Sequence, residues 1–83
     1  MKTVRGTWYE VWSKNNRGMK LPGPVFDKYQ NLREARKQIR ESNERQIKAG
    51  YKPEEWYIVV ADSIRTTTDE GMVISETLTY AVI

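Results

Sequence analysis

Hydrophobic and polar residues alternate at the start of this chain in the pattern of a β-strand. Residues 4–13 are rich in β-forming residues. Alternation places Trp8 and Trp12 on one face of this strand and Tyr9 and Val11 on the other. Because both faces carry apolar groups, the pattern predicts either a central strand or a strand with one aromatic face at a binding surface.

Two more strands are predicted towards the C-terminus. The continuous apolar run at residues 56–61 is flanked by turn formers and predicts a buried strand that continues to residue 67. Gly71 closes a hairpin at residues 69–71, and residues 72–82 alternate as a last strand. If Ile64 pairs with Ile74, the even-numbered residues of both strands line the core beneath a helix.

Residues 31–49 are predicted to form that helix. Asn31 and Glu34 have the spacing of a capping box, and Gly50 provides a C-terminal stop. One narrow apolar stripe recurs near the helical period and consists of Leu32, Ala35, Ile39 and Ile47.

The segment between the first strand and the helix contains a turn signal at residues 15–18. Residues 19–21 are expected to return as a short edge strand before Pro22 stops it. The prediction is therefore a single α+β domain over residues 1–83. Its antiparallel or mixed sheet has three or four strands in β(β)αββ order, with one helix packed on one face.

The composition limits the chemistry of this chain, because its 83 residues include neither cysteine nor histidine. A thiol nucleophile, a disulfide and an imidazole base are excluded, and most routes to zinc binding are lost. We therefore expect no enzyme activity, no metal and no cofactor. No segment has the apolar length of a signal peptide or a membrane span, which predicts a cytoplasmic protein without a membrane partner.

Charge is divided along the chain. Residues 1–40 carry ten Lys and Arg against three acidic residues, a net charge of +7, whereas residues 41–83 carry four against eight, a net charge of −4. Within the helix, a basic helix face is defined by Arg33, Arg36, Lys37 and Arg40. Its like-charged pairs at i,i+4 are mildly destabilising. The second half is expected to pair internally, Glu41 with Arg45 and Glu44 with Lys48.

Two interpretations of the basic helix face remain open at this stage. It is either a solvated surface whose arginines pair with acids on the sheet, or a surface for an anionic partner. Arg17 and Lys20, in the basic loop at residues 14–28, would extend a surface for an anionic partner. Asp62 and Glu76 would face each other in the expected register, and we then expect either a salt bridge to Arg36 or Arg40 or a frayed end of the sheet.

The sequence is compatible with two roles for Trp8 and Trp12. Tryptophans in a domain of this size usually belong to the core. If they are exposed, they would serve as interface anchors or as platforms on which nucleic-acid bases stack.

The layout resembles that of small α+β proteins encoded by phages and prophages. The resemblance is carried by the aromatic strand 8–13, the helix opening 31–36 and the closing hairpin that begins at residues 56–59. It implies an anti-defence or host-takeover role in the host cytoplasm, in which such proteins inhibit a host defence or nucleic-acid enzyme.

Three partners fit these residues. The leading hypothesis is a non-catalytic inhibitor or adaptor that meets an acidic protein surface through the basic helix face and the 14–28 loop. The second hypothesis is direct nucleic-acid binding by the same residues, and the third is sequestration of an anionic nucleotide. A homodimer is compatible with all three.

Overall fold

The computed structural model describes all 83 residues and contains one helix and one antiparallel three-stranded sheet. The strands are β1 (Lys2–Ser13), β2 (Trp56–Thr67) and β3 (Val73–Val82), and the helix is α1 (Leu32–Lys48). The element order is β-α-β-β, and β2 lies in the centre of the sheet. This confirms the α+β class. The expected edge strand at residues 19–21 is reduced to an isolated bridge between Trp12 and Lys20.

The helix begins and ends where its sequence signals lie. The Asn31 side chain accepts a hydrogen bond from the Glu34 backbone N–H at 2.8 Å, which is the N-capping half of the predicted box. Ala49 is the C-cap, and Gly50 follows it with a φ of 83°, a conformation that favours glycine.

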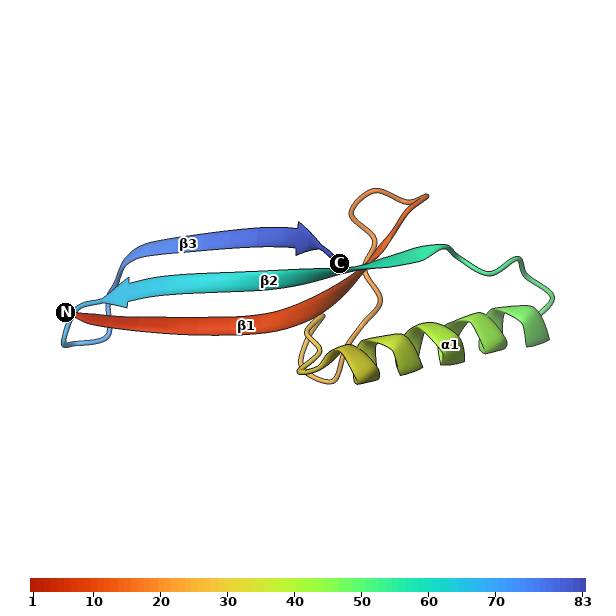
Figure 1. The fold of residues 1–83 in the computed structure, drawn as a ribbon, viewed down its shortest axis with the longest axis horizontal. Coiled ribbons are helices and arrows are strands. Elements are labelled where there is room, and N and C mark those ends of the chain that lie inside the picture. Colours follow the sequence, from red (N-terminus) through yellow and green to blue (C-terminus); the bar gives the residue numbers. More distant parts are fainter.

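The helix covers only one end of the sheet. It packs chiefly against β1, and Figure 1 shows all three strands extending beyond its N-terminal end. The core cluster lies at this end and consists of Val11, Leu21, Tyr29 and Ala35, with Tyr9, Ile39, Trp56 and Ile58 packed against it. The molecule is therefore elongated, with extents of 53 × 21 × 20 Å.

We call the face that carries Tyr9, Val11 and Ile58 the helix side of the sheet, and the opposite face the open side. Strand alternation puts Trp8 and Trp12 on the open side, as predicted. Both are half-buried rather than part of the core.

The expected pairing of β2 with β3 is wrong. Ile64 lies opposite Thr77 instead of Ile74, and a bulge interrupts the register between Thr66 and Thr67. Even-numbered residues of β2 therefore share a face with odd-numbered residues of β3. The apolar residues of β3 consequently lie on the open side and do not join the core beneath the helix.

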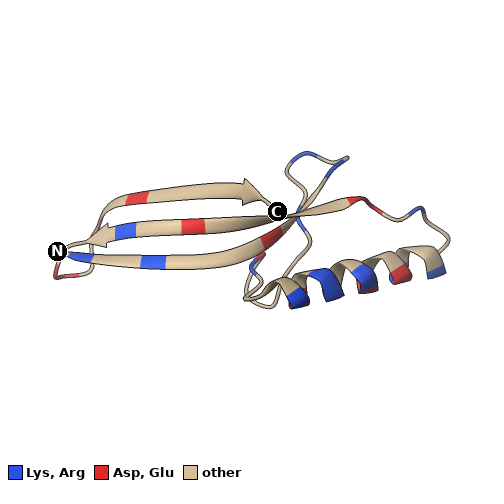
Figure 2. Ribbon diagram, viewed as in Figure 1, with Lys and Arg blue, Asp and Glu red and all other residues tan.

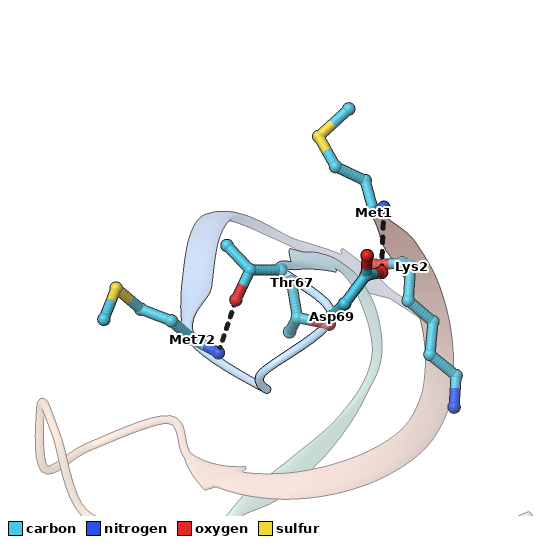
Figure 3. Close-up of polar contacts among 6 residues, drawn as sticks. Met1, Lys2, Thr67, Asp69 and Met72 are labelled. Atoms are coloured by element: carbon cyan, nitrogen blue, oxygen red, sulfur yellow. Dashed lines mark hydrogen bonds and ion pairs between the residues drawn. The ribbon is translucent and has the colours of Figure 1, made fainter.

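Contacts at the hairpin end involve backbone and polar groups (Figure 3). The Thr68 hydroxyl accepts from the Met72 N–H at 3.1 Å, and Gly71 has the positive φ expected of it, 89°. The terminal amino group of Met1 lies 3.2 Å from the Asp69 carboxylate. These contacts close the turn without adding an apolar cluster at this end.

Candidate partner-binding surfaces

The basic helix face is exposed along the first half of α1, where Figure 2 shows the helix rich in Lys and Arg. Its four residues line a shallow hollow together with Asn31 and Glu34, and no apolar side chain contributes to it. Lys37 lies 4.0 Å from Glu41, whereas Arg33, Arg36 and Arg40 form no ion pair. Three guanidinium groups are thus exposed without a protein counter-ion.

The acids that were expected to neutralise these arginines have other partners. Asp62 accepts a hydrogen bond from the Thr7 hydroxyl at 2.8 Å, and Glu76 forms a 3.2 Å ion pair with Arg65. Asp62 lies opposite Thr79, so the expected Asp62–Glu76 pair does not exist. The expected bridges to Arg36 or Arg40 are also absent, because the helix covers the other end of the sheet.

The second half of α1 also differs from expectation. Neither Glu41 with Arg45 nor Glu44 with Lys48 comes within ion-pair distance. The only ion pair of the helix joins its two halves, from Lys37 to Glu41.

Lys20 and Arg17 are separated from the basic helix face. They line a groove of about 420 Å³ together with Trp12 and Tyr57, and this groove shares no residue with the hollow on α1. The Ser13 hydroxyl holds the start of this loop, since it accepts from the backbone N–H groups of Asn15 and Asn16 and donates to Glu54 at 2.6 Å. The chain therefore presents two basic areas instead of one continuous surface.

A buried carboxylate on the open side, which was not among the predicted site residues, accepts hydrogen bonds from three donors. Glu10 is 3% exposed and accepts from the indole N–H groups of Trp8 and Trp12, at 2.8 and 3.1 Å. Lys20 Nζ lies 2.8 Å from the same carboxylate. An acid two residues from a tryptophan on each side, all on one strand face, is the signal that would have identified this cluster.

Burial and hydrogen bonding act on Glu10 in opposite directions. Burial alone would raise the pKa of Glu10, but the hydrogen bonds from Lys20, Trp8 and Trp12 outweigh it and lower that pKa. The hydrogen bond between Glu10 and Lys20 also raises the pKa of Lys20. The charge of Lys20 is thus compensated within the chain, which leaves Lys14 and Arg17 as the cations of this groove without an ion pair.

Neighbouring side chains of the same chain already cover the rings of Trp8 and Trp12. Lys28 lies 4.2 Å from the Trp8 ring centre, and Lys20 lies 5.5 Å from that of Trp12. The Trp12 ring also packs against Tyr80, with ring centres 5.1 Å apart. These tryptophans are therefore held in an internal cluster on the side of the sheet away from α1.

Phe26 is an exposed aromatic side chain on a strained backbone. It is 85% exposed and is the only non-glycine residue with a positive φ, 55°. Its turn is closed by hydrogen bonds from Gly23 N–H to the Phe26 carbonyl and from Lys28 N–H to the Val25 carbonyl. Phe26 lines a hollow on the open side together with Trp8, Leu78 and Tyr80.

Comparison with protein-family models, curated proteins and solved structures finds no match. The structure contains no group of three or more His, Cys, Asp or Glu side chains that could hold a metal ion. Nor does it have a helix with the length and hydropathy needed to cross a membrane.

Proposed function

We propose that this chain is a non-catalytic binding protein, an inhibitor or adaptor, whose basic helix face engages an acidic surface of a protein partner. The observation that carries the proposal is the exposure of Arg33, Arg36 and Arg40 without a counter-ion. Like charges at i,i+4 and cations near a helix N-terminus both cost stability in the free chain. A carboxylate-bearing partner would remove that cost and form charge-assisted hydrogen bonds with the guanidinium groups.

The position of the tryptophans favours a protein over a single-stranded nucleic acid. Single-strand binders combine phosphate contacts with base stacking in one groove. Here Trp8 and Trp12 lie on the open side, and their rings already contact Lys28, Lys20 and Tyr80. A strand bound along α1 would not reach them. The inhibitory role follows from the resemblance to phage-encoded proteins and is part of the same proposal.

A charge-reversal experiment tests the basic helix face. The variant Arg36→Glu/Lys37→Glu/Arg40→Glu is compared with the control Lys2→Glu/Lys48→Glu/Lys52→Glu, which changes the net charge by the same amount at exposed positions elsewhere. We expect wild type and control to capture the same acidic protein from host lysate in a fixed stoichiometry, and the variant to lose it. Equal capture by all three proteins would remove the basic helix face from the proposal.

A titration with labelled single- and double-stranded nucleic acids separates the alternative partner. Phosphate binding weakens steeply between about 50 and 200 mM salt, whereas no binding is expected here even at the lower concentration. Salt-sensitive binding that the triple variant abolishes would make nucleic acid the partner instead.

A further inference from the structure

The chain exposes more surface than a monomer of its mass normally does. Its accessible surface is 6347 Å² at a mass of 9.8 kDa. The scaling of folded monomers gives about 5,150 Å², which is about 1,200 Å² less than the chain exposes. Its radius of gyration is 15.8 Å, whereas a compact chain of this length has about 12 Å. A stable protein interface buries roughly 800 Å² on each partner, so the excess is sufficient for one.

Strand β3 is the largest uncovered element. All ten of its residues are exposed, and no other segment pairs with its outer edge. The Ile83 N–H donates to the Ile58 carbonyl at 3.0 Å, which fixes the alternation of hydrogen bonds along the strand. In an antiparallel pair, that phase directs the N–H and C=O groups of Leu78, Tyr80 and Val82 away from β2. These groups form an unpaired row along the edge.

The two edges of the sheet are protected differently. The outer edge of β1 is bridged by Tyr29 and Lys20 near the helix, and the part of this edge that no segment pairs with carries Lys2 and Arg5. Positive charges on an edge are a common means of preventing pairing with another chain. β3 has no Lys, Arg or Pro, and its single charged residue is Glu76, which is compensated by Arg65. The β3 edge therefore lacks the protective charges and prolines, and its bulge lies near its N-terminal end, outside the segment from Leu78 to Val82.

The side chains of β3 match a second copy of themselves. Leu78, Tyr80 and Val82 lie on the open side, whereas Thr77 and Thr79 lie on the helix side. Consider an antiparallel pair of β3 strands related by a twofold axis near Leu78. Residues whose backbone N–H and C=O groups point away from β2 then lie opposite residues of the same kind in the second copy. This pairing thus places one apolar row beside the other and brings Glu76 opposite Tyr80 instead of another acid.

We propose that β3 pairs with β3 of a second copy of this chain, which extends the two sheets into one of six strands. The row Leu78, Tyr80 and Val82 lies at the centre of this interface. The hollow beside it adds the side chains of Trp8 and Phe26, and charged residues make up the rest of its lining. The inference concerns a surface distinct from the basic helix face, so it holds or fails independently of the proposed function.

Light scattering after size-exclusion chromatography tests the dimer. Wild type should have a mass of about 20 kDa, twice that of the chain, and the mass should fall on dilution. Leu78→Lys/Val82→Lys should elute as a monomer, whereas Thr77→Lys/Ala81→Lys adds the same charges on the helix side of the same strand and should weaken association less. A monomeric wild type at about 200 µM, or equal association of both variants, would overturn the proposal.

Amide hydrogen exchange on the wild type provides a test that requires no variant. Thr77 and Thr79 bond to β2 in monomer and dimer alike and serve as the internal reference. The outward N–H groups of Leu78, Tyr80 and Val82 gain acceptors only in the dimer, so their exchange should slow by about tenfold or more on going from dilute to concentrated protein. Unchanged fast exchange at these three amides would contradict pairing of the β3 edges.

Discussion

Lys20 Nζ lies 2.8 Å from the Glu10 carboxylate and connects the middle of β1 to the loop that leads towards α1. The carboxylate is almost completely buried and also accepts both indole N–H groups of its strand neighbours. One acidic side chain thus fixes the positions of two tryptophans and one lysine. This contact network orders the open side near the core.

Removing this carboxylate should destabilise the fold. Glu10→Ala leaves two half-buried indole N–H groups and the Lys20 ammonium without their acceptor and is expected to lower the free energy of unfolding by about 2–3 kcal/mol. Glu55→Ala is the matched control, because Glu55 is exposed and its side chain forms no hydrogen bond or ion pair; its effect should stay within about 0.5 kcal/mol. Urea denaturation measures both values, and equal midpoints would contradict the structural role of Glu10.

The same carboxylate predicts how stability depends on acid pH. The folded-state pKa of Glu10 is lowered from its ordinary value of 4.5, so its contribution is present above that pH and is lost as the pH falls through the folded-state pKa. Glu10→Gln should lose this part of the acid dependence. Urea midpoints measured from pH 7 downwards would disprove the assignment if wild type and variant fell in parallel.

Two isoleucines of α1 should respond differently to the same change. Ile39 packs against the core cluster, whereas Ile47 is 61% exposed. Ile39→Asn should lower the free energy of unfolding by about 2–3 kcal/mol, because an amide replaces a packed apolar group. Ile47→Asn should cost about 0.5 kcal/mol. Thermal melts followed by circular dichroism compare the two variants, and similar losses would mean that the helix packs differently from the structure.

Two glycines provide a test of the turn before the helix. A Cβ at Gly23 would lie 2.5 Å from the Lys28 carbonyl oxygen, whereas a Cβ at Gly6 would lie 3.6 Å from the Trp8 ring, an ordinary contact. Gly23→Ala is expected to cost about 1–3 kcal/mol, since backbone must move. Gly6→Ala should be neutral or stabilise the strand by up to about 1 kcal/mol. The reverse order in a denaturation series would show that this turn adopts another conformation.

The helix and the existence of the three strands could be predicted because their signals are local. Asn31 and Gly50 mark the ends of α1, and Gly71 marks the hairpin turn. The second half of the helix was harder, since long charged side chains such as Glu41 have several neighbours within reach, and only Lys37 comes close.

The faces of β3 could not be predicted, because they depend on one residue. The bulge at Thr66 and Thr67 inserts an extra residue on the β3 side, and a one-residue shift exchanges the two faces of a strand. Alternation along β3 correctly separated its apolar row from its threonines. It could not indicate that this row lies on the open side, away from α1.

The basic helix face was predicted by composition, and its lack of counter-ions follows from the position of α1. The helix extends beyond the strands that carry Asp62 and Glu76, so its arginines do not reach these carboxylates and the expected ion pairs do not form. The role of Glu10 was not predicted, because only the aromatic residues of this strand were considered as candidates. Its role depends on Lys20, ten residues away in the sequence.

The placement of α1 at one end divides the fold into regions of unequal resistance to opening. Near the helix, side chains from β1, the loop and α1 converge on Val11 and Tyr29, both fully buried. Beyond it, β3 is held by its hydrogen bonds to β2, by the Glu76–Arg65 ion pair and by the contact between Tyr80 and Trp12. The C-terminal strand should therefore detach first and leave the region around α1 folded. A molecule that binds this strand would turn the most readily released part of the chain into its best-anchored part.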